Sequence, residues 1–304
     1  MLEPVTGRLP MCLLEVFEKF PDQEACIAHL EHIRFGDAPV CPLCGSHKVV
    51  RKSDSQRIGR WNCYGCGSSF NVLSGTLFQK TKIPLQKWFL ALSLILDAKK
   101  SISSYQLARH LNIRQQAAWF MLQRIRSEMV AKQHTIRLQG IVEADESYIG
   151  GSPHTNDPIK TTKSIVGRGT PKLAVLGVVQ RGGDVFAQVS GDRLTGENIA
   201  KFIGKAVIPE GSHLITDGFR SYNAVQSFLK HSVFKRYGGK FRRGIHTNTI
   251  EGFWAGFKRS WFGTHHWYKR KYAFLYVAEY CWKYNARSNP DAFGTFLKDC
   301  FAFC

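Results

Sequence analysis

The stretch Gly140–Ile149, which reads GIVEADESYI, decides the fold of this chain. Its β-branched and aromatic residues predict a strand that carries the acidic residue Asp145 near its middle. Two further acids occupy distinct settings downstream: Asp217 follows the short apolar run 214–216, and Glu251 lies on a helix rich in basic and aromatic residues. A chain with a net charge of +19 has little reason to gather carboxylates unless they have a function.

The segments that follow predict an α/β core around this first strand. Further strands are expected at 172–180, 184–190 and 213–216, and helices at 196–207, 221–230, 248–261 and 272–287. The turn Arg181-Gly182-Gly183 is a good hairpin signal between the second and third strands. The order βββαβα…α, with the first carboxylate on the first strand, fits a ribonuclease-H-like mixed sheet.

Asp145, Asp217 and Glu251 are the predicted catalytic residues. Carboxylates suit Mg²⁺ or Mn²⁺, which prefer hard oxygen donors. Two such ions, about 3.5–4 Å apart, can activate the attacking oxygen and stabilise the leaving oxygen of a phosphodiester. For Glu251 a structural role stays open, since Asn248-Thr-Ile-Glu251 also matches a capping box, and the two roles can coexist.

Three further residues are candidates for roles that support the predicted catalytic acids. Strand alternation places Glu143 on the same face as Asp145 and Glu146 on the opposite face, and either could support the metal ligands. His246 could position a water, a ligand or the scissile phosphate, or could be an ordinary surface histidine.

The charge balance predicts a polyanionic partner, most simply nucleic acid, since 42 Lys and Arg face 23 Asp and Glu. Between Lys235 and Lys271, ten basic residues stand against one acid, with aromatics interleaved, as in a surface that binds the DNA backbone. We expect Lys258, Arg259 and His246 to contact DNA there. The loop 152–172 is either a solvated basic loop or an arm that contacts DNA.

Four of the nine cysteines form a predicted zinc site. Two Cys-x-x-Cys pairs, separated by eighteen residues, match the spacing of a zinc ribbon. A glycine follows each pair and tolerates the left-handed backbone that such turns often need. Four thiolates leave no open position for water, so the Zn²⁺ would be structural. The expected ligands are Cys41, Cys44, Cys63 and Cys66.

Residues 101–129 have the pattern of a helix-turn-helix. The first helix would be 105–111, with Asn112 in left-handed geometry at the turn and a second helix from about 115 to 130. Trp119, Leu122 and Ile125 would face inward. Residues near the start of the second helix would touch base edges, as in a recognition helix; these are Arg114, Gln115 and Gln116. Helical packing without DNA contact is the alternative.

Together these motifs resemble the zinc-ribbon DDE transposases of bacterial insertion sequences, the ISXO-like group. The resemblance covers roughly residues 20–285, and its matching stretches are 41–66, 74–76 with 83–85 and Trp88, 117–119 with 124–126, 142–151, 215–222 and 246–259. It implies a ribonuclease-H-like catalytic domain that uses Mg²⁺ (or Mn²⁺) to cut the ends of a mobile element and join them to a target.

Carried over residue by residue, the resemblance makes Asp145, Asp217 and Glu251 the metal ligands and Lys258 a phosphate contact. Related elements can use Asn as the third ligand, so Asn248 is a lesser candidate. The chain departs from the family's more usual short polar start of the second helix at 114–116, which bears on sequence preference.

The expected architecture is multidomain α/β. It comprises a helical lead-in at 1–35, a zinc ribbon at 36–80, a helix-turn-helix DNA-binding region at 81–135, a ribonuclease-H-like DDE catalytic domain at 136–290 and a C-terminal tail at 291–304. The helix at 84–98 carries an apolar stripe, and in the lead-in Leu13, Leu14, Phe17 and Phe20 have helical spacing.

The expected function is a transposase that binds the terminal inverted repeats of an insertion sequence. Its partners would be double-stranded DNA, both element ends and target, and further copies of itself as a homodimer or larger assembly. No apolar run reaches the ~18 residues of a membrane span, and no signal-peptide pattern is present, so we expect a cytoplasmic, nucleoid-associated bacterial protein. The alternatives are a non-catalytic DNA-binding regulator derived from a transposase, and a nuclease that cuts without joining.

Overall fold

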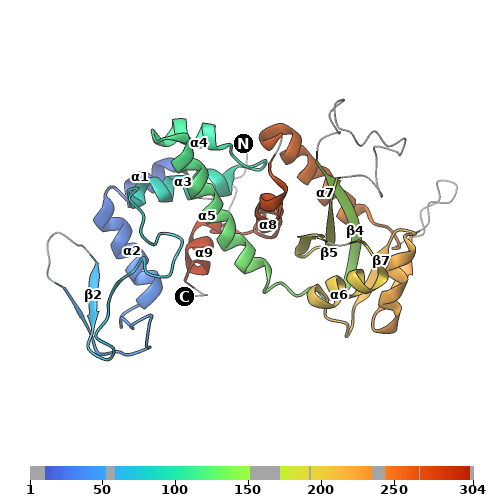
Figure 1. Cartoon of the computed structure of the whole chain (residues 1–304), viewed down its shortest axis with the longest axis horizontal. Helices are drawn as coiled ribbons and strands as arrows, with labels where there is room; N and C mark the ends of the chain where they lie inside the picture. Colours follow the sequence, from blue (N-terminus) through green and yellow to red (C-terminus); the bar gives the residue numbers. More distant parts are fainter. Residues whose placement is uncertain are drawn as a thin grey trace, which may run out of the picture. The chain divides into compact units, whose positions relative to one another are not determined.

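The computed structural model describes residues 11–52, 59–150, 172–191, 193–234, 244–266 and 268–301 (Figure 1). The basic loop expected at 152–172 lies almost wholly outside the described residues, as does the segment 235–243, which carries five of the ten basic residues between Lys235 and Lys271. The chain divides into two compact units. Unit 1 is Met1–Glu128 with Ser288–Cys304, and unit 2 is Met129–Arg287.

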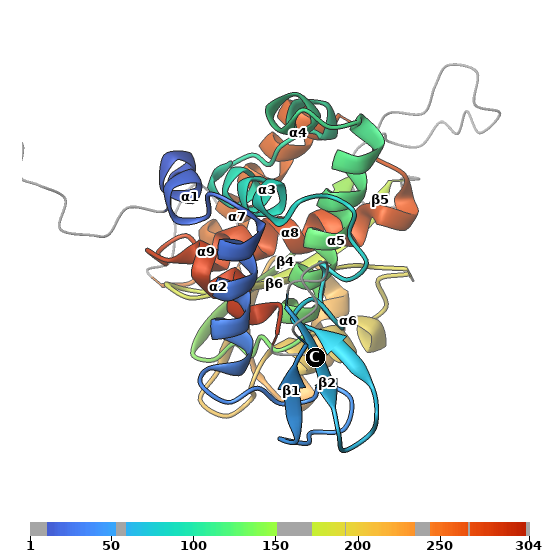
Figure 2. The same cartoon turned by 90° about the vertical axis from the view of Figure 1, so that its left-hand side faces the viewer.

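The ribbon in unit 1 is a small antiparallel sheet in the order β1-β2-β3. Its strands are β1 (Val49–Arg51), β2 (Arg60–Cys63) and β3 (Ser69–Asn71), and β1 and β2 lie side by side in Figure 2. Cys41, Cys63 and Phe70 form its buried cluster. An apolar cluster this small cannot stabilise a fold alone, so the ribbon depends on an additional constraint.

In the described part of unit 1 the chain also forms six helices. They are α1 (Leu13–Lys19), α2 (Gln23–Phe35), α3 (Leu85–Asp97), α4 (Ser104–Leu111), α5 (Gln115–Gln133), which continues into unit 2, and α9 (Ala292–Asp299). The apolar helix α3 is almost wholly buried, as its predicted stripe requires. The turn between α4 and α5 has the predicted geometry, since Asn112 adopts φ 48° and ψ 60°.

Two details of unit 1 differ from the expectation. Of the four apolar residues at helical spacing in the lead-in, Phe20 is buried, whereas Leu13, Leu14 and Phe17 are exposed; the second buried residue is Val16, four positions before Phe20. The segment expected as a C-terminal tail contains α9, whose Phe293, Phe296 and Leu297 are buried. Helix α9 contacts α2 and α3, so its apolar face is buried within unit 1.

Unit 2 is built on a five-stranded sheet in the order β6-β5-β4-β7-β8. The strands are β4 (Ile141–Ile149), β5 (Leu173–Gln180), β6 (Val185–Val189), β7 (His213–Thr216) and β8 (Lys230–Val233). Strands β4, β5 and β6 pair antiparallel, whereas β7 runs parallel to β4 and β8 parallel to β7. This mixed order, with β4 in the centre, is the predicted ribonuclease-H-like arrangement.

Helices cover both faces of this sheet. Helix α6 (Gly196–Ala206) and the 3-10 helix η1 (Arg220–Ser227) pack on the face that presents Val142 and Ala144 of β4. Helices α7 (Asn248–Ser260) and α8 (Ala273–Asn285) pack on the face that presents Ile149. The segment 221–230 was predicted as one helix, but the chain leaves η1 and forms β8, whose sequence KHSV lacks a clear apolar alternation.

Helix α7 approaches the sheet closely at one glycine. A Cβ atom on Gly177 of β5 would lie 2.5 Å from Cζ2 of Trp254, so only glycine leaves room for this ring. Gly177 is the register partner of Asp145, which places α7 against the same part of the sheet as the first acid. Among the helices that the structure describes, none combines the length and apolarity that a bilayer crossing requires.

Candidate active site

Two of the predicted acids meet because their strands are neighbours. The parallel register pairs Ala144 of β4 with Thr216 of β7, so the next residues along the chain, Asp145 and Asp217, emerge side by side. Carboxylate oxygens of Asp145, Asp217 and Glu146 all lie within 4.8 Å of one another. The structure thus brings two sequence-predicted residues together and adds a third acid to them.

Glu146 joins this cluster from the other face of β4. Its Oε2 accepts a hydrogen bond of 3.3 Å from the hydroxyl of Tyr222, which is buried among the residues of the α6 face. Strand alternation predicted this opposite direction. Alternation alone does not predict that the Glu146 carboxylate comes close to Asp145 and Asp217, which the length of the Glu side chain makes possible.

Glu251 lies in the first turn of α7 and is not part of the acid trio formed by Asp145, Glu146 and Asp217. The Thr247 hydroxyl donates to Glu251 Oε1 at 2.9 Å. The helix begins differently from the capping-box alternative, because Thr247 is the N-cap residue, makes no side-chain cap bond, and Asn248 is already helical. Glu251 is exposed and close enough to Asp145 to influence its ionisation.

Crowded carboxylates alter the protonation of Asp145. Burial, together with the negative charges of Glu146, Asp217 and Glu251, raises the pKa of Asp145 from 3.8 to about 7. A divalent cation would relieve this repulsion and return the carboxylate to its ionised form. An all-carboxylate donor set with mutual repulsion therefore fits Mg²⁺ or Mn²⁺.

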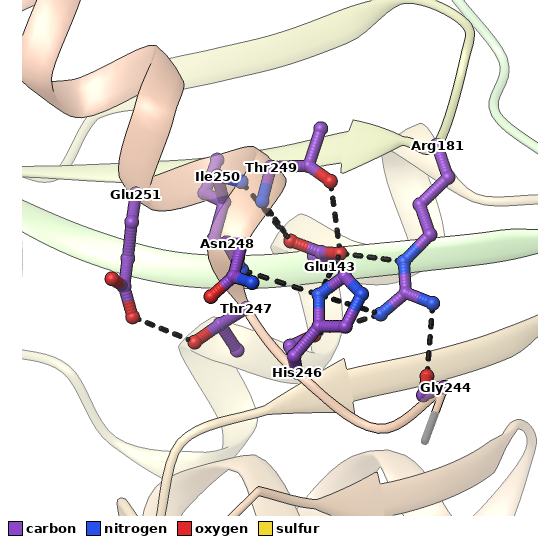
Figure 3. A network of polar contacts seen from close by, with 9 residues as sticks. All are labelled: Glu143, Arg181, Gly244, His246, Thr247, Asn248, Thr249, Ile250 and Glu251. Atoms are coloured by element: carbon purple, nitrogen blue, oxygen red, sulfur yellow. Dashed lines mark hydrogen bonds and ion pairs between the residues drawn. The ribbon is translucent and has the colours of Figure 1, made fainter. Parts of the chain in front are cut away.

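A second carboxylate on β4 binds the start of α7 (Figure 3). Glu143 is 0 % exposed. Its Oε2 accepts hydrogen bonds from the backbone N–H of Thr249 at 2.8 Å and of Ile250 at 3.1 Å. Its Oε1 accepts from the Thr249 hydroxyl at 3.0 Å and from Arg181 Nε at 2.6 Å.

Arg181 extends this network to the segment that precedes α7. Its guanidinium donates to the carbonyl oxygen of Gly244 at 2.8 Å and to that of His246 at 2.9 Å. The imidazole Nδ1 of His246 lies 3.1 Å from Arg181 Nη2 and 3.3 Å from Glu143 Oε1. His246 is thus neither a free surface histidine nor part of the acid trio, and its Nδ1 is already engaged.

Helix α7 has the predicted division of faces. Its buried side contains Phe253, Trp254 and Phe257, whereas Glu251 and Lys258 are exposed on the adjacent stripe. Arg259, also exposed, follows in the last turn. The cations therefore stand on the same helix as Glu251, about two turns further along.

The four ribbon cysteines converge as their spacing predicted. Their sulfur atoms all lie within 4.8 Å of one another, with Cys41 Sγ 3.8 Å from Cys66 Sγ and Cys44 Sγ 3.5 Å from Cys63 Sγ. Gly45 adopts φ 70° after the first pair. Four sulfur donors at such a distance suit a closed tetrahedral Zn²⁺ site.

The predicted base-reading residues lie at the start of α5. Arg114 and Gln116 are exposed, whereas Gln115 is half-buried and donates through Nε2 to Ser104 Oγ of α4 at 2.7 Å. Leu122 and Ile125 are buried as expected, and Trp119 is only half-buried.

An open pocket of about 660 Å³ lies beside this helix. It is lined by the segment 79–83 and by Trp88, Gln116, Ala117, Phe120 and Arg124. The Arg124 guanidinium stacks 5.4 Å from the Phe120 ring centroid and donates to the carbonyl oxygen of Gln79. Lys80 and Lys82 add two exposed cations, so the pocket next to Gln116 is basic and partly aromatic.

Comparisons with known proteins match one domain over the segment that contains the acids and another over the segment that contains the four cysteines. Residues 137–285 match the ISXO2-like transposase domain, and residues 21–69 match the transposase zinc-ribbon domain. The chain is 28 % identical over 247 residues to an uncharacterized protein in transposable element ISH50 of Halobacterium salinarum, across 78 % of this chain and 82 % of the relative.

Solved structures with detectable likeness include complexes of Mos1 transposase. The paired-end complex with the left transposon end has a TM-score of 0.29 at 13 % identity, over 70 % of this chain and 75 % of that one. The Mos1 mariner paired-end complex with Mn has a TM-score of 0.30 at 13 % identity, over 70 % and 77 %. Since such scores are low, the fold assignment depends on the strand order. On its two domain matches, this chain belongs to the ISXO2-like transposases with an N-terminal zinc ribbon.

Proposed function

We propose that this transposase catalyses Mg²⁺- or Mn²⁺-dependent cleavage and transfer of DNA strands at the ends of a mobile element. The observation that supports this proposal is the convergence of Asp145, Glu146 and Asp217 where β7 ends beside the central strand β4, with Glu251 on the adjoining helix. Within a strongly basic chain, such a group of acids suits a divalent cation held against a polyanion.

Asp145, Asp217 and Glu251 would hold the divalent ions. When bound, two such ions supply activation of the attacking water or 3′-hydroxyl and stabilisation of the leaving oxygen. Glu146 would add negative charge from the opposite face, and Asn248 remains the lesser candidate ligand. Lys258, exposed on the stripe of Glu251, would neutralise a phosphate of the strand being cut.

Recognition of the terminal inverted repeats would be the role of unit 1. The exposed residues Arg114 and Gln116 would contact base edges from α5, and the cations of the neighbouring pocket would bind the DNA backbone. The half-buried Gln115 would contribute less, since its amide already donates to Ser104. A structural Zn²⁺ would order the ribbon, and pairing of two element ends would require a homodimer or a larger assembly.

The test is an assay on DNA duplexes that carry the element ends, with and without Mg²⁺. We expect metal-dependent cleavage and joining to a target plasmid, both lost in Glu251→Gln, while end binding is retained. The matched control is Glu197→Gln, which removes an exposed carboxylate of unit 2 that pairs with Lys201 in the i, i+4 position. End binding without cleavage under either metal would support a regulator, and cleavage without joining would support a nuclease.

A further inference from the structure

Glu143 is a fully buried acid that the proposed chemistry does not use. An ionised carboxylate is costly to bury unless charged and hydrogen-bonding partners compensate for the lost water. Glu143 has both, since it is 0 % exposed and receives Arg181 and three donors from the first turn of α7. These charged and hydrogen-bonding partners indicate that Glu143 has a specific structural role.

The partners of Glu143 show that its role is at the N-terminus of α7. The first backbone N–H groups of a helix have no partner within the helix. The N-cap residue of α7, Thr247, makes no side-chain cap bond, and Glu143 instead accepts from the N–H groups of Thr249 and Ile250. A negative charge at this position also interacts favourably with the helix dipole. Glu143 thus caps α7 from a strand more than 100 residues earlier in the sequence.

Both ends of this contact lie next to proposed metal ligands. Glu143 precedes Asp145 by two residues on one strand, so the two side chains leave the same face of β4. Ile250, whose N–H it accepts, immediately precedes Glu251. The contact therefore ties the backbone that carries Asp145 to the backbone that carries Glu251, and Arg181 secures the approach to α7 through the carbonyls of Gly244 and His246 (Figure 3).

We infer that Glu143 is a positioning residue that holds Glu251 in reach of the ions bound by Asp145 and Asp217. This inference rests on the proposed function, because it assigns Glu143 a role toward the proposed metal site. Glu143 itself would not touch the ions, since its two oxygens are occupied by the helix start and by Arg181.

The test measures Mn²⁺ binding to the full chain by electron paramagnetic resonance, independently of DNA cleavage. We expect Glu143→Gln to weaken Mn²⁺ binding about 10- to 100-fold, which is typical when a supporting partner of a metal ligand is removed. Arg181→Lys, which keeps the positive charge but loses the forked contacts to Gly244 and His246, should weaken it less. The matched control is Glu279→Gln, a buried acid of α8 that pairs with Lys283 on the same helix and should leave binding unchanged.

A double-mutant cycle separates positioning from general stabilisation. If Glu143 acts through Glu251, adding Glu143→Gln to Glu251→Gln should cause little further loss of Mn²⁺ affinity. Additive losses, or unchanged Mn²⁺ binding in folded Glu143→Gln, would overturn the inference. Should Glu143→Gln fail to fold, Arg181→Lys in the same cycle decides the question, because wild-type Mn²⁺ affinity in that variant would also overturn it. A wild-type chain that binds Mn²⁺ but cuts no element end would refute the proposed function. The role of Glu143 in Mn²⁺ binding would still be tested by the variants above.

Discussion

The ribbon cysteines and the acid site are both groups of side chains that could hold a metal ion, yet the chain builds them in opposite ways. The four cysteines come from one segment of 26 residues and meet around local turns. The carboxylates come from β4, from the residue after β7 and from α7, and they meet only when the whole sheet has formed. The first site should therefore depend on its metal for structure, whereas the second should have its structure without metal.

The largest expected effect is on the ribbon. Cys63→Ala removes one of four thiolates, and because a structural Zn²⁺ contributes directly to folding, the ribbon should lose both zinc and its ordered structure. Metal analysis should fall from one zinc per chain to well below one. The control Cys12→Ser, at an exposed thiol outside the site, should keep it. Retention of one zinc per chain in Cys63→Ala would contradict the expectation that the ribbon depends on four cysteine ligands for its metal and its structure.

The second effect concerns activity without loss of structure. Asp145→Asn should lower strand cleavage by at least about 10³-fold, since residues that act as one catalytic unit fail together. It should leave end binding and the folded state intact, because the apolar clusters on both faces of the sheet remain. Cleavage assays paired with circular dichroism would check this. Loss of folding together with cleavage would mean that the acid site, like the ribbon, is structural.

A smaller effect should appear in the pH dependence of stability without added divalent ions. The pKa of Asp145 is raised by burial, and by its acidic neighbours, to about 7, so the folded state holds this proton more tightly than the unfolded state. The resulting contribution to the unfolding free energy is fully present below about pH 4 and is lost as the pH rises through about 7.

Denaturant melts at a series of pH values would measure this loss. Asp145→Asn should flatten the curve between those limits, and Mg²⁺ added at pH 8 should recover stability in the wild type but not in the variant. An identical pH profile in both proteins would argue against crowded carboxylates at this site.

The smallest effects should come from single DNA contacts of unit 1. Gln116→Ala should cost about 1–3 kcal/mol in binding of the element end and reduce discrimination against a mutated end. Lys82→Gln, in the wall of the same pocket, should weaken all DNA about equally and lower the salt slope by about one. Fluorescence anisotropy with matched and scrambled ends would separate the two. Equal behaviour of the two variants would indicate that α5 does not read sequence.

The same contrast explains what the sequence could predict. Cysteine spacing is a local signal, and the convergence of the four ribbon cysteines was predicted from it. Asp145 and Asp217 were also predictable, because each stands in or directly after a strand with a clear apolar pattern. The strand β8 and the helix α9 were missed: KHSV has no apolar alternation, and α9 gains its burial from α2 and α3, which are remote in sequence.

The role of Glu143 shows where the sequence argument stops. Alternation along β4 placed it on the face of Asp145, but its partners Thr249 and Ile250 lie more than 100 residues away. No local pattern indicates that a strand residue will cap a distant helix. Arg181 was noticed only as part of a hairpin turn, whereas in the structure it neutralises Glu143 and holds the chain that enters α7.

The most direct test of the account is a crystal structure of the chain grown with Mn²⁺, with anomalous data collected at the manganese and zinc edges. We expect one zinc peak among the four ribbon cysteines and manganese density bounded by Asp145, Asp217 and Glu251, with Glu143 still hydrogen-bonded to α7. Manganese density absent from the acids, or held by Glu143 in place of Glu251, would contradict it.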